Sequence, residues 1–196
     1  MSISLQKGQK ISLTKDNASL NNIMVGLGWD EVQQKKKGFF APKPQDIDCD
    51  ASALLLTGGK LQKKQDVVYF GNLQHMSGAV RHMGDNLTGA GEGDDEQILV
   101  KLKEVPQEID KIVIVVNIYQ AKQRGQHFGL IRNAFIRIVD GNTNAEMCRF
   151  NLSEDYTDMT ALIVAEIYRH NGEWKFNPVG QGTKDNSLTE IVNKYK

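Results

Sequence analysis

Cysteine, proline and histidine are all scarce in this sequence of 196 residues, and no long apolar run occurs in it. The two cysteines, Cys49 and Cys148, lie far apart and form no CxxC pattern, which argues against both a zinc site and a redox site. No stretch approaches the roughly 20 apolar residues of a membrane span, and the first thirteen residues lack the apolar core of a signal peptide. We therefore expect a cytoplasmic protein whose cysteines are reduced core thiols.

A net charge is also lacking, because 24 basic residues balance 24 acidic ones. No global field then favours nucleic acid or an anionic membrane. The sequence contains no GxxxxGK[ST] loop, no GxSxG elbow and no HExxH motif. Carboxylate pairs such as Asp94 and Asp95 have no nucleophile to activate, and the four histidines are scattered. We expect neither an enzyme nor a nucleic-acid partner.

Short β-rich runs separated by turn residues fill most of the chain, which predicts an all-β sandwich or barrel. The most apolar run covers residues 112–118, and its β-branched residues predict a central strand that is covered on both faces. Residues 2–13 predict a hairpin that turns near Lys7 and Gly8. Residues 160–168 fit either a strand or a helix.

The end of the sequence carries an apolar stripe at helical spacing, formed by Leu188, Ile191, Val192 and Tyr195. Ser187 and Glu190 fit a capping box in front of this stripe. We expect a sandwich over residues 1–182 and a short helix in a tail over residues 183–196. The helix packs on the sandwich in our preferred interpretation, and the alternative is a loosely held tail that docks a partner.

The most informative segment is GDNLTGAGEGDDE, residues 84–96, which combines five acidic residues with four glycines. This composition suits neither a helix nor a strand, so we expect a loop. Two carboxylates about 4 Å apart in a partly wet site repel by roughly 4 kcal/mol, and that repulsion must be offset. Glycines let carboxylate and carbonyl oxygens converge, and hard oxygen donors in a flexible frame suit calcium better than magnesium.

A second acidic cluster, Asp46, Asp48 and Asp50, precedes this loop. If the residues between them point inward on a strand, Asp48, Asp50 and Ser52 project together on the other face. An EF-hand is rejected, because the turn glycine is missing and Thr57 replaces the final Glu. We expect this strand end and the glycine-rich loop to face each other and to hold one or two Ca²⁺ ions. The alternative is that both are solvated turns.

A basic run, Lys35, Lys36 and Lys37, stands before two aromatic residues, Phe39 and Phe40. Beside calcium loops, such a segment resembles a lipid-contacting edge. A solvated loop is the simpler interpretation, so peripheral membrane contact is not favoured.

Several segments resemble one known family in order along the chain: MVGLGWD, IDCDAS, GDNLTGAGEGDDE, NAFIRIVD, RFNLSEDYTDMTAL, AEIYRHNGEWKF and VGQG. Up to about residue 182 the sequence is similar to the TerD family of tellurium-resistance and general stress proteins. The resemblance implies a cytoplasmic, calcium-binding β-sandwich with C2-like features. It implies a stress-response module in which the ion orders acidic loops for a partner, either a TerC-type membrane protein or other Ter proteins. A slime-mould branch described as cyclic-AMP-binding provides the alternative of a small-ligand protein.

The resemblance also implies the metal ligands, which match the family's WD, DxDAS, GDNxTG and GDDE elements. They are Asp30, Asp48, Asp50, Asp85, Asn86, Thr88, Gly89, Asp94, Asp95 and Glu96. The sequence departs from the family pattern in two places. Gln120 replaces an acid that follows the corresponding strand in many members, and the insertion over residues 35–45 is more similar to the TerZ or TerX branch.

Overall fold

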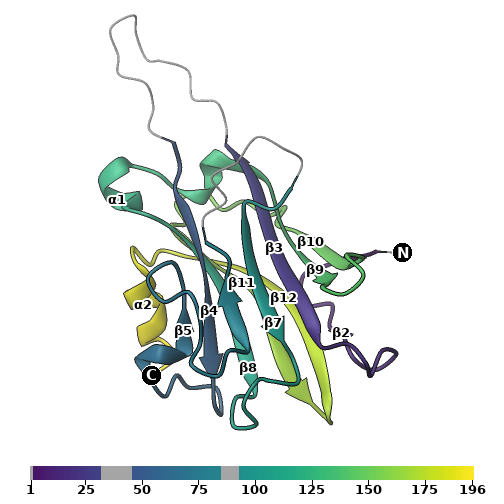
Figure 1. The fold of residues 1–196 in the computed structure, drawn as a ribbon. Helices are drawn as coiled ribbons and strands as arrows, with labels where there is room; N and C mark the ends of the chain where they lie inside the picture. The colour runs from purple at the N-terminus through teal and green to yellow at the C-terminus, as the bar shows by residue number, and fades with distance from the viewer. Residues whose placement is uncertain (1, 32–45, 85–92) are drawn as a thin grey trace, which may run out of the picture.

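The computed structural model describes residues 2–31, 46–84 and 93–196, which form two six-stranded sheets packed around a shared core (Figure 1). The first sheet contains, in spatial order, β1 (Ile3–Leu5), β10 (Glu146–Asn151), β9 (Ile131–Asp140), β3 (Asn22–Glu31), β7 (Glu96–Lys101) and β6 (Val80–His82). The second contains β2 (Ile11–Ser12), β12 (Glu173–Thr183), β11 (Ala161–His170), β8 (Lys111–Ile118), β4 (Cys49–Leu56) and β5 (Val67–Val68). The all-β sandwich is therefore confirmed.

Helices in the described residues are short and join or follow the strands. They are the 3₁₀ helices η1 (Lys64–Asp66) and η2 (Phe128–Leu130) and the α-helices α1 (Ala121–Arg124) and α2 (Leu188–Asn193). Figure 1 shows α1 and α2 on the same side of the molecule as β5. None of the helices in these ranges combines the length and the apolar character that crossing a bilayer requires.

Strand β8 is the central strand that its apolar sequence predicted. It lies between β11 and β4 in the second sheet, and every residue from 112 to 118 is buried. Ile112 and Ile114 face the core between the sheets, whereas Val113 and Val115 belong to a second apolar cluster on the outer face. Side chains alternate across a strand, so a strand covered on both faces must be apolar throughout.

The predicted N-terminal hairpin is wrong, although its turn is present. Gln9 N donates to Gln6 O at 2.9 Å, and Gly8 has the positive φ of 76° that such a turn uses. The flanking strands then separate, since β1 pairs in parallel with β10 and β2 pairs with β12 of the other sheet. The opening segment thus contributes an edge strand to each sheet. Local turn residues cannot reveal which partner a two- or three-residue strand will choose.

Residues 161–168, for which a helix was an open alternative, belong to strand β11. This strand pairs with β12 on one side and with β8 on the other. Long-range pairing on both edges outweighs any local helical tendency of the segment.

Helix α2 begins where the capping residues predicted. Ser187 Oγ accepts a hydrogen bond from the Glu190 amide at 3.3 Å, and Glu190 Oε2 accepts one from the Asn186 amide at 2.8 Å. The two side chains therefore satisfy amide donors at the start of the helix. The arrangement differs from a capping box in one respect: Glu190 accepts from the amide of Asn186 instead of that of Ser187.

The helix also packs on the protein's own sandwich, as we expected. Ile191 is 1% exposed and lies in the outer cluster with Leu54, Leu56, Val113 and Val115. Leu61 N donates to Tyr195 O at 2.6 Å and holds the end of the chain. Apolar burial and a backbone hydrogen bond thus secure the C-terminus over β4 and β8.

We predict that Ile191→Ala destabilises the protein by about 2–4 kcal/mol, because it leaves a cavity in the outer cluster. For a chain of this length the melting temperature should fall by roughly 5–15 °C. Thr189→Ala on the exposed face of the same helix is the control and should change stability by less than about 0.5 kcal/mol. Thermal unfolding followed by circular dichroism measures both variants. Equal melting temperatures for Ile191→Ala and wild type would contradict the observed packing.

Candidate functional site

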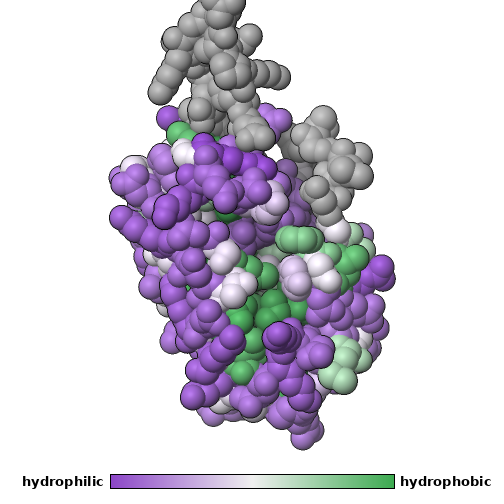
Figure 2. Space-filling model, turned by 90° about the vertical axis from the view of Figure 1, so that its left-hand side faces the viewer, coloured by the Kyte–Doolittle hydropathy of each residue, from purple (hydrophilic) through white to green (hydrophobic). Residues whose placement is uncertain are grey.

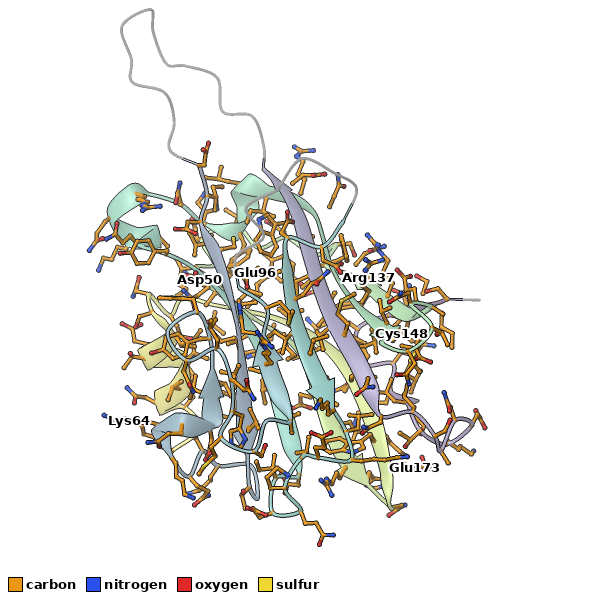
Figure 3. The ribbon with its side chains drawn as sticks, viewed as in Figure 1. Asp50, Lys64, Glu96, Arg137, Cys148 and Glu173 are labelled. Atoms are coloured by element: carbon orange, nitrogen blue, oxygen red, sulfur yellow. The ribbon has the colours of Figure 1, made fainter. Side chains whose placement is uncertain are left out.

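Glu96, the last residue of one acidic segment, contacts the strand that carries Asp50 of the other and so joins the two sheets at one end of the sandwich. Glu96 begins β7, and its Oε2 accepts hydrogen bonds from the Ala51 amide of β4 and from His82 Nε2 of β6, both at 2.9 Å. Strand β5 pairs with β4 only at Ala53 and Leu54, so no strand among the described residues extends along this edge as far as Ala51. The carboxylate of Glu96 therefore accepts the hydrogen bond that the Ala51 amide would otherwise donate to a neighbouring strand. Figure 3 shows Glu96, on β7 of the first sheet, and Asp50, on β4 of the second, towards the same end of the sandwich.

Asp95 and Asp30 form a like-charged pair beside this junction. Asp95 Oδ2 accepts a hydrogen bond from the Trp29 amide at 2.7 Å, and Asp30 Oδ2 accepts one from Asn133 Nδ2 at 2.7 Å. Burial raises the pKa of Asp95, the Trp29 hydrogen bond opposes that rise, and the negative charges of Asp30 and Asp94 add to it. The carboxylate of Asp95 is therefore held where a nearby cation would stabilise its charged form.

Asp94 is held by an arginine on the outer face of the first sheet. Its Oδ1 lies 2.7 Å from Arg137 Nε and its Oδ2 lies 3.1 Å from Arg137 Nη2, and Gln97 Nε2 donates to Oδ2 at 3.2 Å. The Asp94 side chain has no exposed surface. This bidentate arrangement is the strong form of an arginine–carboxylate contact. Asp94 thus joins β7 to β9 (Figure 3 labels Arg137).

Gly26 of β3 makes room for that ion pair. A Cβ atom at this position would lie 2.3 Å from three atoms of the Asp94 carboxylate, far inside van der Waals contact. The glycine in MVGLGWD is therefore explained by the close approach of a charged side chain across the strand. Sequence reasoning missed this role and that of Arg137. The signal available was a single arginine inside the apolar alternation of NAFIRIVD.

The DxDAS segment lies on β4 with the alternation that we predicted. The intervening residues Cys49 and Ala51 are buried in the core, whereas Asp50 and Ser52 lie on the outer face of the second sheet. Asp50 is directly opposite Asn117 of β8. Asp48 is exposed just before the strand, and its carbonyl accepts a hydrogen bond from the Tyr119 amide at 2.7 Å.

Four of the predicted ligands, Asp85, Asn86, Thr88 and Gly89, lie outside the described residues, as do Lys35–Lys37, Phe39 and Phe40. Within residues 2–31, 46–84 and 93–196, no three His, Cys, Asp or Glu side chains are grouped so that they could hold a metal ion. Among the described acids, Asp94 and Glu96 are paired inside the protein, whereas Asp95 lies half-buried near the negative charge of Asp30.

Comparisons with known proteins agree along the whole chain. The TerD domain model matches residues 1–195. The sequence is 53% identical over 199 residues to the stress response protein SCP2 of Bacillus subtilis (strain 168), covering 100% of both chains. It is 48% identical over 183 residues to the tellurium resistance protein TerD of Serratia marcescens, covering 93% of this chain and 91% of that one.

A solved structure supports the fold. The crystal structure of a homologue of telluride resistance protein (TerD) from Streptomyces coelicolor A3(2) has a TM-score of 0.66 at 21% identity. The similarity covers 90% of this chain and 98% of the other.

We predict that Gly26→Ala destabilises the protein by about 1–3 kcal/mol, because the added methyl group displaces Asp94 from Arg137. Elsewhere in a strand, replacing glycine with alanine tends to stabilise. Gly93→Ala, in the bend before β7, is the control, since a Cβ there meets nothing within 4 Å among the described residues and its φ is not positive. Urea denaturation measures both variants. The predicted role of Gly26 would be refuted if the two substitutions had the same effect.

Proposed function

The chain belongs to the TerD family of stress-response and tellurium-resistance proteins, and from this premise we propose that it is a calcium-binding module. One or two Ca²⁺ ions at the acidic end of the sandwich order the loops there, and the ordered surface binds a partner. The proposed role is binding in the cytoplasm, without catalysis. Relatives named for stress response and for tellurium resistance support the physiological setting.

The observation that carries the proposal is the half-buried carboxylate of Asp95, which accepts a hydrogen bond from the Trp29 amide and lies near the negative charges of Asp30 and Asp94. Asp95 is partly desolvated, and its pKa is raised by burial and by the adjacent negative charges. Such an arrangement lowers the stability of the protein unless a cation lies between or beside the carboxylates. The chain runs from Asp95 directly back into the glycine-rich segment, so further oxygen donors are close in sequence.

The donor chemistry at this end fits calcium. The exposed or half-buried candidates Asp30, Asp48, Asp50 and Asp95 offer carboxylate oxygens, which are the hard ligands that Ca²⁺ takes six to eight at a time. The described residues provide too few ligands for a complete site. Asp85, Asn86, Thr88 and Gly89, outside the described ranges, would complete the set in this proposal.

Asp94 and Glu96 have a supporting role in the proposal. Arg137 and Gln97 engage both oxygens of Asp94, and the Glu96 oxygen that faces β4 already accepts two hydrogen bonds. Both side chains fix the backbone on either side of Asp95. In the proposal, Asp94 and Glu96 hold the backbone of Asp95 in place, and they are not the primary ligands of the ion.

The partner would be a TerC-type membrane protein or another Ter protein, as the family resemblance implies. Calcium would act by neutralising the acidic end, so that a partner meets an ordered surface without a dense negative charge. Binding of the partner should then depend on calcium.

We predict that millimolar calcium raises the melting temperature by several degrees and that a chelator reverses the rise, because ligand binding stabilises the native state. Asp95→Asn should raise the melting temperature without calcium, since it removes a repelled charge while its amide oxygen can still accept the Trp29 hydrogen bond. The same variant should shrink the calcium-induced rise. Asp16→Asn at an exposed loop position is the control. Differential scanning calorimetry and calorimetric titration with CaCl₂ provide the measurements.

Two outcomes would contradict the proposal. Calcium could leave the melting temperature and the titration heat of the wild type unchanged at millimolar supply. Alternatively, Asp95→Asn could bind calcium as tightly as Asp16→Asn does, which would remove Asp95 from the site.

A further inference from the structure

A cavity of about 430 Å³ lies on the outer face of the second sheet, beside the start of α2. Its volume falls in the range of roughly 300–1,000 Å³ that small-molecule sites occupy. The residues that matter for its chemistry are Asp50, Ser52, Phe70, Asn117, Tyr119 and Lys122. Figure 2 faces this side of the molecule and shows apolar surface in a hollow that polar side chains frame.

The cavity exists because α2 covers only part of the sheet. Leu54 and Leu56 of β4, with Val113 and Val115 of β8, lie under the helix in the outer apolar cluster. The same two strands become polar towards the acidic end of the sandwich, where the helix does not reach. The outer face of one sheet therefore changes from a helix-binding surface to a polar cavity floor within four residues.

Two buried polar atoms on the cavity floor have no hydrogen-bond partner. Ser52 has no exposed surface and Asn117 is 7% exposed, yet Ser52 Oγ and Asn117 Oδ1 find no donor or acceptor within the described residues. Buried polar groups are nearly always paired, because water is lost on burial. An apolar pair at these positions would have suited a strand whose neighbouring outer residues are Leu and Val. Both residues line the cavity, so a rotation of either side chain would bring its polar atom to a space that a ligand can enter.

The charges around the cavity indicate which ligand would fit. Asp50, directly opposite Asn117, brings a carboxylate to the half-buried inner part. Lys122 is exposed at the edge, where its long side chain can remain in water. Oxygen acceptors thus converge on the floor and repel anions, whereas a group that carries both a positive charge and N–H donors satisfies them.

Aromatic rings at the edge suit the same ligand. Phe70 is 60% exposed and Tyr119 is 43% exposed, which is unusual for large side chains beside a cavity. Arg124 already lies 5.1 Å from the centre of the Tyr119 ring, so this ring contacts a cation in the folded protein. Aromatic faces attract cations, most strongly where water is excluded.

We propose that this cavity binds a small organic amine, whose ammonium group donates hydrogen bonds to Ser52 and Asn117 and is neutralised by Asp50. The carbon skeleton of the amine lies against Phe70 and Tyr119. The cavity shares Asp50 with the proposed calcium ligands, whereas its floor atoms, Ser52 Oγ and Asn117 Oδ1, are not among the calcium candidates.

The test is a titration of the full chain, in the presence of a chelator, with n-butylammonium chloride followed by NMR at the Asn117 side-chain amide. We expect saturable shifts with a millimolar or tighter Kd. Tetramethylammonium carries the charge without N–H donors, n-butanol has neither the charge nor the amine, and cyclic AMP is an anion. All three controls should bind at least about tenfold more weakly.

Two variants separate binding from folding. Ser52→Ala should weaken butylammonium binding about tenfold while leaving the melting temperature equal or higher, because it removes an unpaired buried hydroxyl. Ser19→Ala at an exposed position is the control. Phe70→Ala, at a largely exposed edge residue, should weaken binding severalfold without unfolding the protein. Calcium titration of Ser52→Ala should match the wild type, which keeps this test independent of the calcium proposal.

The proposal is overturned if butylammonium causes no shift at 100 mM, since water alone would then occupy the floor. It is also overturned if n-butanol binds as well as butylammonium, or if Ser52→Ala binds as tightly as wild type.

Discussion

The buried carboxylate of Glu96 is the contact on which the acidic end of this sandwich depends. It accepts hydrogen bonds from the Ala51 amide and from His82 Nε2, and so connects β4 of one sheet to β7 and β6 of the other. A carboxylate removed from water must be compensated by donors, and both of these donors are themselves buried. The hydrogen bond between Ala51 and Glu96 fixes the distance between the sheets at this point. Asp50 directly precedes Ala51 in the sequence, and Asp95 directly precedes Glu96. Without this hydrogen bond, the two acidic segments would have no fixed relation to each other.

Three consecutive acids before and at the start of β7 serve three different purposes because the regular strand begins only at Glu96. Strict alternation would instead place Asp94 and Glu96 on the same face. Glu96 points to the core and joins the sheets, whereas Asp94 lies on the outer face, paired with Arg137 over Gly26. Asp95 lies between them and is compensated only in part, by the Trp29 amide. The two paired acids fix the backbone on either side of Asp95, and its carboxylate is the one that the proposed function assigns to a cation.

The sequence was enough to predict the two-sheet sandwich and the position of its acidic end. It was not enough to predict which contacts Asp94, Asp95 and Glu96 each make. Strand β8 was predictable because a strand covered on both faces is a continuous apolar run, and helix α2 was predictable because its apolar residues recur at helical spacing. The pairing of β1 and β2 with different sheets was not predictable, since two or three residues carry no information about a partner more than a hundred residues away. Asp94 and Asp95 look equivalent in the sequence. Only the position of Arg137 on β9, beyond β3 in the same sheet and 43 residues from Asp94 in the sequence, distinguishes them.

Strand β4 shows why the candidate sites lie so close together. Ala51 and Ala53 fill the core with small side chains, which lets the sheets approach at the Glu96 junction. On the other face, Asp50 and Ser52 line the floor of the cavity, and Leu54 and Leu56 form the surface on which α2 packs. Moving the register of β4 by one residue would reverse both faces, placing carboxylates in the core and alanines under the helix. The pairing of eight consecutive β4 residues with β8 prevents that slip, and the same pairing sets Asp50 beside Asn117. A single strand register therefore determines the sheet junction, the cavity and the docking of the C-terminal helix.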